Sequence, residues 1–496
     1  MFERIIHEHV LQELERESAT ALSRQLYLIF SRLVLNGVLG AGTKLPSSRA
    51  LAQELGVSRN TVIIAYEQLM AEGYVETRSG SGTFVSETVP DMSSQVFARA
   101  PSLEALREQP ILSARGSVLV DEAQATEQQW GAFVPGVPDV TLFPHQRWLR
   151  LLRRYWRAPQ PDFLTYAHGA GHLPLRQALC EHLRLMRSVR CQPEQVLITG
   201  GIHQSLRLIS LMLADEKEQV WMEDPGYWGA SSVLRSSGLQ LEPIPVDEEG
   251  LSPTVEQAQQ PPKLIFVTPS HQYPLGHVMS LSRRRMLLEY AHQHGVWIIE
   301  DDYDSEFRFS GRPIASLQGL DEHGRVLYLG TFSKTLFPSL RLGFMVVPKV
   351  LAHLMAVGLS ELYREGRLVE QAALADFIAQ GEYAAHIRKM RGVYARRQML
   401  LRTAIERHFG ADWPLSTEQA GLHLVMHLPA AVDDVLLCRQ AFAELGVWVR
   451  PLSNYFFGAQ KQSGLLFGYA AVPDEQIGPV FDCLAKMIKQ ACASYL

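Results

Sequence analysis

The stretch Val326-Leu-Tyr-Leu-Gly-Thr-Phe-Ser-Lys334, with Arg341 seven residues beyond its lysine, is the most informative part of this chain. A lysine that follows an apolar strand pattern and a short hydroxyl residue can hold an aldehyde cofactor as a Schiff base. Thr331, Ser333 and Arg341 are then expected to gather on the phosphate of that cofactor. A Ser-Lys pair alone is usually a solvated surface feature, so the interpretation needs a second motif.

The second motif is the acidic run Glu300-Asp-Asp-Tyr303, which ends the apolar strand pattern Val296-Trp-Ile-Ile. A pyridine nitrogen stays protonated, and so acts as an electron sink, only beside a carboxylate. Because the acidic run, the lysine and the downstream arginine occur in the order and spacing that such a site requires, the sequence favours a cofactor site over a solvated surface lysine.

Composition limits the class of protein. A chain of 496 residues allows about three domains, and its 47% hydrophobic and 20% charged residues are typical of a soluble globular protein. The net charge of −5 argues against a chain coated in nucleic acid but does not exclude one small DNA-binding module. Five cysteines without CxxC spacing indicate reduced thiols, with neither a disulfide frame nor a metal site. Without a signal-peptide pattern or a long apolar window, we expect a cytoplasmic protein.

The chain divides into three regions by pattern. Residues 1–86 predict helices and a short β-hairpin. Residues 87–128, with prolines at 90, 101 and 110, predict a linker. Within this linker, residues 103–106 and 118–120 can dock locally. Residues 129–496 predict a large α/β domain, because apolar runs alternate with helical patterns, which is typical of a mostly parallel sheet covered on both faces. The runs are Val196-Leu-Ile-Thr, Val220-Trp-Met, Leu264-Ile-Phe-Val, Val296-Trp-Ile-Ile, Val326-Leu-Tyr-Leu and Phe344-Met-Val-Val.

The first region predicts three helices. The first keeps a helical period from Leu22 to Leu33 and stops at Asn36-Gly37. Ser47 or Ser48 caps a second helix that runs to about Leu55, and Ser58 caps a third. The inner face of the third helix is expected to hold Val62, Ala65, Leu69 and Met70. Residues 73–85 then alternate around a glycine-rich tip, which indicates a hairpin.

Helix, turn, helix and hairpin form a winged helix-turn-helix, whose second motif helix enters the major groove by its N-terminal end. At that end Arg59 can read a guanine edge, Asn60 can pair with adenine, and Thr61 can bond a phosphate or a base. The residues expected to contact double-stranded DNA are Lys44, Arg49, Ser58, Arg59, Asn60, Thr61, Arg78 and Gly80. The alternative is a three-helix bundle that binds protein.

This region closely resembles the GntR-type winged helix. The matching stretches are Leu45-Pro-Ser-Ser-Arg49, Leu55-Gly-Val-Ser-Arg59-Asn-Thr-Val62, Glu72-Gly-Tyr74 and Gly80-Ser-Gly-Thr-Phe-Val85. The resemblance implies that Arg49, Arg59, Asn60, Thr61 and Gly80 touch DNA.

From about Trp130 the chain resembles a fold-type-I pyridoxal-phosphate protein of the aminotransferase kind, with a smaller C-terminal α+β subdomain. The landmarks stand in order: Tyr166, Gly169 and Gly171, Thr199-Gly-Gly-Ile-His-Gln204, Glu223-Asp-Pro-Gly-Tyr227, Asp301 and Lys334. The resemblance implies that Tyr227 stacks on the cofactor ring, Asp301 pairs with its nitrogen and Tyr303 bonds its hydroxyl. It implies that Lys334 forms the internal aldimine and that the phosphate is held by Gly201, Ile202, His203, Thr331, Ser333 and Arg341.

A winged helix joined by a linker to this fold resembles the MocR-type transcriptional regulators. The resemblance implies a regulator that binds an operator and senses pyridoxal phosphate, an amine or an amino acid. It implies a homodimer, with a head-to-tail arrangement as one option, in which Tyr166 acts across the interface.

Two departures from the aminotransferase pattern make efficient transamination doubtful. Tyr273 stands where an asparagine commonly precedes Pro-x-Gly, and Gly464-Leu-Leu-Phe-Gly468 lacks the arginine that binds a substrate carboxylate. Arg450 is either an effector-binding residue or a solvated or ion-paired surface residue. The alternatives to a regulator are a working aminotransferase with a DNA-binding appendage, and a scaffold or cofactor-storage protein.

Overall fold

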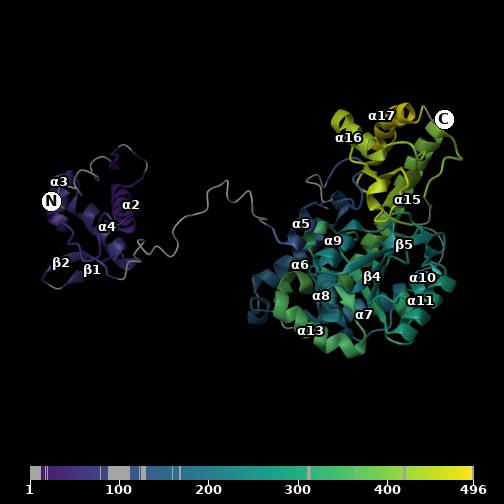
Figure 1. Cartoon of the computed structure of the whole chain (residues 1–496), viewed down its shortest axis with the longest axis horizontal. Helices are drawn as coiled ribbons and strands as arrows, with labels where there is room; N and C mark the ends of the chain where they lie inside the picture. The colour runs from purple at the N-terminus through teal and green to yellow at the C-terminus, as the bar shows by residue number, and fades with distance from the viewer. Residues whose placement is uncertain are drawn as a thin grey trace. The chain divides into compact units, whose positions relative to one another are not determined.

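The computed structural model describes most of the chain. The described residues are 10, 13–16, 18, 20–78, 80–87, 112–121, 123, 130–158, 160–166, 169–309, 314–364, 366–416 and 420–493. The chain forms two compact units, Met1–Ile111 and Leu112–Leu496 (Figure 1). Most of the predicted linker, including residues 103–106, lies outside the described residues.

The small unit consists of three helices and a hairpin. They are α2 (Leu22–Leu35), α3 (Ser48–Leu55), α4 (Arg59–Ala71) and the antiparallel strands β1 (Val75–Arg78) and β2 (Gly82–Val85). Ser47 caps α3 by accepting a hydrogen bond from the Ala50 amide at 3.2 Å, and Ser58 caps α4 by accepting one from the Thr61 amide at 3.1 Å. Gly56 ends α3 at φ 63°, a left-handed conformation that glycine adopts without strain. The predicted winged helix-turn-helix is therefore present.

The prediction for the inner face of α4 is wrong at one residue. Val62, Ala65 and Leu69 are buried as expected, but the fourth buried residue is Tyr66, whereas Met70 is 38% exposed. At about 100° per residue, position 70 lies roughly 90° from the centre of the buried face. The Tyr66 hydroxyl donates to the Pro46 carbonyl at 3.0 Å, which satisfies its polar end.

The large unit is built on an eight-stranded sheet in the order β3-β10-β9-β8-β7-β4-β5-β6. Its strands are β3 (Val196–Thr199), β4 (Gln219–Asp224), β5 (Gln240–Asp247), β6 (Gly250–Leu251), β7 (Leu264–Val267), β8 (Trp297–Asp302), β9 (Val326–Thr331) and β10 (Gly343–Val346). Neighbours from β5 to β9 pair in parallel, whereas β10 is antiparallel to β3 and β9. The mostly parallel sheet is thus confirmed. Strand β5 was not predicted, because Pro243 and Pro245 interrupt its apolar pattern.

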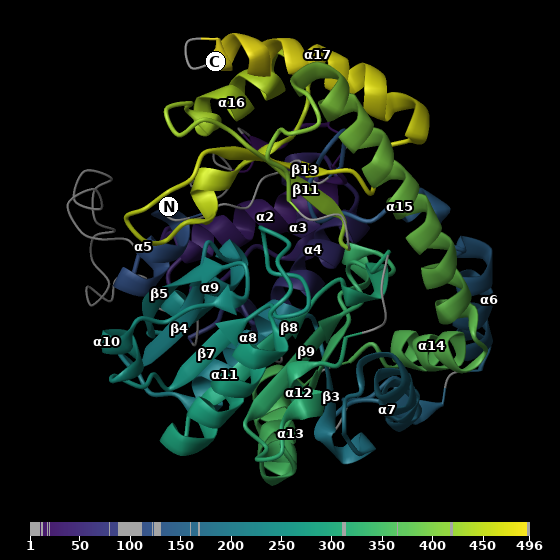
Figure 2. The same ribbon diagram turned by 90° about the vertical axis from the view of Figure 1, so that its right-hand side faces the viewer.

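Helices cover both faces of this sheet (Figure 2). Alternate residues of each strand face opposite ways, so Met222 packs with α8 (Ile202–Leu213), α9 (Trp228–Ser236) and α13 (Lys349–Tyr363). Its neighbour Trp221 packs with α11 (Leu281–His294) on the other face. The remaining helices of this part are α5 (Ala114–Asp121), α6 (His145–Arg157), α7 (Leu173–Arg187), α10 (Val255–Ala258), α12 (Leu317–Leu320) and α14 (Leu368–Ala379).

The C-terminal part is the smaller α+β subdomain that the resemblance implies. Its antiparallel sheet has the order β11 (His423–His427), β13 (Gly464–Gly468), β12 (Arg450–Pro451), and its helices are α15 (Glu382–Phe409), α16 (Asp434–Leu445) and α17 (Asp474–Cys492). The buried Arg397 of α15 joins it to the rest, because its guanidinium lies 2.8 Å from Asp139. The same guanidinium lies 2.9 Å from Asp474 of α17, which holds α15 and α17 together. Within the described ranges, no helix combines the length and the apolar composition needed to cross a bilayer.

The region predicted as a linker contains one described helix, α5. Its Arg115 forms an ion pair with Glu216 at 3.0 Å, so this end of the region lies on the large unit. Leu119 and Val120 are exposed, so local docking at residues 118–120 stays a prediction.

Candidate functional site

A cavity of about 330 Å³ opens where the parallel strands end. Ligands of open α/β sheets bind beyond the carboxyl ends of the strands, because the connections that follow converge there. Ten of the eleven predicted cofactor residues line this cavity: Gly201, Ile202, His203, Tyr227, Asp301, Tyr303, Thr331, Ser333, Lys334 and Arg341. They come from the segments that follow or end β3, β4, β8 and β9 and that precede β10.

Lys334 lies just beyond β9, and its amine faces the cavity. Nζ donates a hydrogen bond to the Gly136 carbonyl at 2.6 Å. Burial lowers the pKa of Lys334, although Asp304 and Asp301 partly oppose the shift. A lowered pKa makes the neutral, nucleophilic amine more accessible near neutral pH.

Asp301 is a buried carboxyl on β8. Burial, and then the neighbouring Asp302, raises the pKa of Asp301 to about 8, while Lys334 opposes the shift. Asp302 is itself held by the Arg187 guanidinium at 2.7 Å and by the Tyr328 hydroxyl at 2.5 Å. A cation placed against Asp301 would favour its charged form, so the carboxyl suits a protonated ring nitrogen.

Tyr303 belongs to a buried polar cluster. Its hydroxyl lies 2.9 Å from Nδ1 of His271, which also lies 3.0 Å from the Asp304 carboxylate. Burial raises the pKa of Tyr303 well above its usual value, so the phenol stays protonated and can donate. His423 lines the same cavity, and its Nε2 lies 2.9 Å from the Pro274 carbonyl.

The other end of the cavity suits an anion. Gly201 precedes α8 at φ 118°, and no side chain caps the helix, so the first N–H groups of α8 remain directed at the cavity. A Cβ atom at Gly201 would come within 3.9 Å of the Arg341 guanidinium, which places that cation at the same end. Glycine is also required at position 343, where a Cβ would lie 2.9 Å from the Cα of Gly201.

His203 and Tyr227 meet beside this end, with Nε2 and the hydroxyl 3.0 Å apart. Burial lowers the pKa of His203, and the positive charges of Arg341 and Lys334 lower it further. The imidazole is therefore favoured in its neutral form, which retains one donor and one acceptor.

Arg450 reaches the cavity from the small sheet. It lies on β12, paired with Leu466 of β13, and its guanidinium carbon is 5.8 Å from the centre of the Trp228 ring. The apolar stretch 464–468 is buried, so the cavity receives its cation from the neighbouring strand instead. The role of Arg450 stayed open in the sequence, because its strand has only two residues and shows no strand pattern.

Other lining residues were missed for similar reasons. Gly136 contributes a carbonyl, which any residue type has, and Trp228 and His423 follow no motif that marks them. Tyr273, noted only as a departure, also lines the cavity.

Tyr166 is the one predicted cofactor residue that does not line the cavity. It is 71% exposed, and its ring lies 5.4 Å from the guanidinium carbon of Arg364. Its role as a cofactor residue stays a prediction that depends on a second subunit.

The residues predicted to contact DNA lie on the surface of the small unit. Lys44, Arg49, Ser58, Arg59, Asn60, Arg78 and Gly80 are exposed, and Thr61 is half-buried. Arg59 approaches Ser48 of α3, with Nε 3.5 Å from the hydroxyl, while the Ser58 and Thr61 hydroxyls lie 2.8 Å apart. Arg78 forms ion pairs with Glu76 at 2.8 Å and Glu87 at 3.1 Å, so part of its charge is compensated.

Two family models match the chain. Residues 22–85 match "Bacterial regulatory proteins, gntR family", and residues 138–484 match "Aminotransferase class I and II". The two matches fall on the two units that the structure shows.

Several relatives match along almost the whole chain. The probable rhizopine catabolism regulatory protein MocR of Rhizobium meliloti is 44% identical, with 92% of each chain covered. The HTH-type pyridoxine biosynthesis transcriptional regulator PdxR of Corynebacterium glutamicum is 31% identical, with 92% of this chain and 94% of that protein covered.

Solved structures match the large unit. The alpha-aminoadipate aminotransferase LysN of Thermus thermophilus, complexed with N-(5'-phosphopyridoxyl)-L-leucine, is 27% identical with a TM-score of 0.67. The match covers 75% of this chain and 97% of that one. A multiple substrate aminotransferase from Thermococcus profundus is 25% identical with a TM-score of 0.68, covering 79% of this chain and 98% of that one.

The raised pKa of Asp301 gives a test by pH. Between its usual pKa of 3.8 and about 8, the folded protein keeps a proton that the unfolded chain loses, so this group's contribution to stability falls as pH rises. The free energy of unfolding of Asp301→Asn, relative to that of the cofactor-free wild type, should therefore increase as pH rises, by up to about 1.4 kcal/mol per pH unit. Denaturant unfolding across this range, with exposed Asp412→Asn as the control, measures the gain. A pH-independent difference would show that Asp301 is ionised in the empty cavity.

Proposed function

This chain belongs to the MocR family of GntR-type transcriptional regulators with an aminotransferase-like domain, and we propose that it regulates transcription by sensing pyridoxal phosphate, an amine or an amino acid. In the proposal the small unit reads an operator and the large unit holds pyridoxal phosphate on Lys334. The cofactor, or an amine or amino acid that reacts with it, is the signal.

The observation that carries the cofactor assignment is the two-ended cavity around Lys334. A buried carboxyl, Asp301, lies at one end, and the uncapped start of α8 with Arg341 lies at the other. Pyridoxal phosphate has a basic ring nitrogen at one end, and its aldehyde, opposite that nitrogen on the ring, lies beside the arm that bears the phosphate. The match to an aminotransferase complexed with a phosphopyridoxyl compound supports the same assignment.

Different residues would bind different parts of such a cofactor. Asp301 would bind the ring nitrogen, Tyr303 the ring hydroxyl, and Tyr227 the face of the ring. Gly201, Ile202 and His203, with Thr331, Ser333 and Arg341, would surround the phosphate. When bound, pyridoxal phosphate supplies an electrophilic carbon that exchanges between amines.

Regulation requires that the signal bind two states of the protein with different affinity, typically by about 1–3 kcal/mol. A homodimer, with a head-to-tail arrangement as one option, would supply two reading modules, and the exposed Tyr166 would serve the partner subunit's cavity. Light scattering that finds only a monomer at working concentration would contradict this part.

Lys334→Ala tests the attachment residue. Borohydride reduction of the loaded wild type should fix the cofactor covalently on the peptide that contains Lys334, as seen by mass spectrometry. The variant should show no fixed cofactor, whereas Lys349→Ala, an exposed lysine of α13, should behave as wild type. Label on another lysine would show that the attachment residue is wrong.

Arg59→Ala tests the reading end of α4. Operator binding should weaken by about 1–3 kcal/mol because a base-edge contact is lost. The cofactor absorbance should stay unchanged, and Arg32→Ala on α2, an exposed cation of the same unit, should bind nearly as wild type. A gel-shift titration measures the affinities, and equal loss in both variants would argue against groove reading by α4.

Arg450→Gln tests the effector. If Arg450 binds an anionic group, the concentration of γ-aminobutyrate or L-alanine that changes the cofactor spectrum should rise about 10- to 100-fold. The response to n-propylamine, which lacks an anion, should not change, and exposed Arg439→Gln is the control. If Arg450→Gln changed the response to γ-aminobutyrate, L-alanine and n-propylamine equally, Arg450 would not bind the anionic group of the effector.

Measuring keto-acid formation with the same amino acids separates the regulator from a working aminotransferase. We expect little keto-acid formation, because Tyr273 stands where an asparagine commonly bonds the cofactor ring oxygen, and the apolar 464–468 strand lacks the arginine that binds a substrate carboxylate. Many turnovers per site would favour the enzyme.

A further inference from the structure

Helix α6 carries a concentration of positive charge outside the cavity. It runs from His145 to Arg157 and has arginines at 147, 150, 153, 154 and 157, without an acidic residue. Trp148 and Leu151 are buried and anchor the helix, while all five arginines are exposed. The chain as a whole has a net charge of −5, so this helix is a local exception.

Two of these arginines have acidic partners. Arg147 pairs with Glu382, and Arg154 lies 3.0 Å from Asp376. Among the residues that the structure describes, no carboxylate forms an ion pair with Arg150, Arg153 or Arg157. The helix therefore presents three positive charges that are free to bind an external anion.

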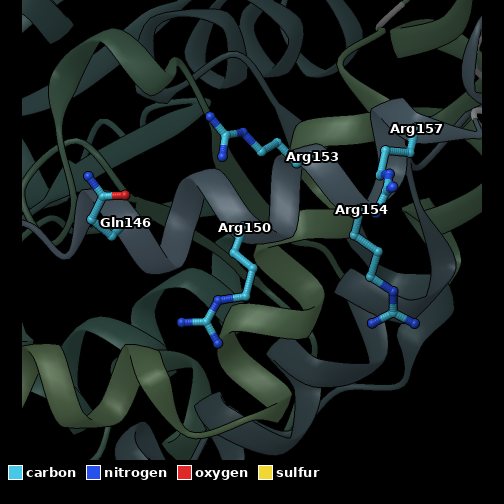
Figure 3. A pocket seen from close by; sticks show the side chains of 5 residues that line it. All are labelled: Gln146, Arg150, Arg153, Arg154 and Arg157. Carbon is cyan, nitrogen blue, oxygen red and sulfur yellow. The ribbon is translucent and has the colours of Figure 1, made fainter.

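The arginines border a broad, open hollow of about 980 Å³. Its lining consists of Gln146, Arg150, Arg153, Arg154 and Arg157 (Figure 3). Arg150 and Arg154 extend to one side of the helix and Arg153 to the other, so the charges spread over the surface instead of meeting at one point. Such a layout suits an extended polyanion better than a single small anion.

Helix stability does not account for this arrangement. Like charges three or four residues apart, such as Arg150 with Arg153 and Arg154, cost roughly 0.2–0.5 kcal/mol per pair. The helix dipole favours cations only in the last turn, which explains Arg154 and Arg157 but not Arg150 or Arg153.

We propose that α6 binds the phosphate backbone of the DNA that flanks the operator. Guanidinium groups match phosphate geometry, and the chain already carries a module that brings duplex DNA to the protein. At about 1.5 Å per residue, Arg150 and Arg157 are roughly 10 Å apart along the axis, the length of about three phosphates on one strand. The contact is independent of sequence, because it reads no base edge.

This inference rests on the proposed operator binding by the small unit, and it is tested with duplexes of two lengths. An operator would first be selected from a random duplex library with the full-length protein. A short duplex holds only the selected core, and a long duplex adds flanks of unrelated sequence on both sides. Affinity for each is measured against salt concentration.

The test variant is Arg150→Ala/Arg153→Ala/Arg157→Ala. The matched control is Arg285→Ala/Lys349→Ala/Lys486→Ala, which removes three exposed cations from α11, α13 and α17 and so changes net charge equally. Wild type and control should bind the long duplex more tightly than the short one, with a salt slope steeper by up to about 2.7. The test variant should lose this advantage, a change of about tenfold or more at low salt, and should bind the short duplex as wild type does.

Cofactor absorbance and thermal unfolding check that the test variant folds, and Arg150→Gln/Arg153→Gln is the milder replacement if it does not. Equal preference for the long duplex in test and control variants would overturn the inference. Unchanged DNA binding with a weakened dimer would overturn it too, and would identify α6 as a subunit interface. Wild type that binds neither duplex would refute operator binding itself.

Discussion

Buried Asp301 and half-buried Lys334 set the electrostatics of the cavity in the large unit. Burial raises the pKa of the carboxyl to about 8 and lowers that of the amine, so the cavity disfavours both charges. The neighbouring Asp302 keeps its place through Arg187 and Tyr328, which fixes the end of β8. A cationic ring nitrogen on a ligand would stabilise the charged form of Asp301, and an electrophilic carbon would react with the neutral amine of Lys334. Binding such a ligand would offset the free-energy cost of burying these two groups.

The sequence predicted the residues of this cavity where they follow a strand directly. Lys334, Asp301, Tyr227 and Gly201 stand at or just after the ends of β9, β8, β4 and β3, and the carboxyl ends of parallel strands share one edge. Arg450 and His423 come from the small sheet instead, and their approach depends on how that sheet packs against the large one. No local pattern contains that information, so the sequence left the role of Arg450 open between two alternatives and did not identify His423.

The fold itself was predictable where local chemistry and periodicity agree. Ser47, Ser58 and Gly56 mark the ends of helices α3 and α4, and each of these helix boundaries was predicted within a residue. One error arose where tertiary packing decides, because β5 contains two prolines yet pairs with β4 from Gln240 to Pro245. The other was a misplaced position on a helix, because the step of about 100° per residue puts Tyr66, and not Met70, on the buried face of α4.

In the proposed function, cofactor binding and DNA binding would be coupled through the segment that leads into α6. The Gly136 carbonyl accepts the hydrogen bond of Lys334, and Pro135, Gly136 and Val137 line the cavity a few residues before α6 begins. A ligand bonded to Nζ competes with that hydrogen bond, so the state of the lysine alters the constraint on this segment. A ligand can change the affinity of the protein for DNA only as far as its own affinity differs between the DNA-bound and the free protein. By linkage, DNA changes the affinity for the ligand by the same factor. A second DNA contact on the large unit would make that difference sensitive to its internal state, because DNA would then contact the same unit that holds the ligand.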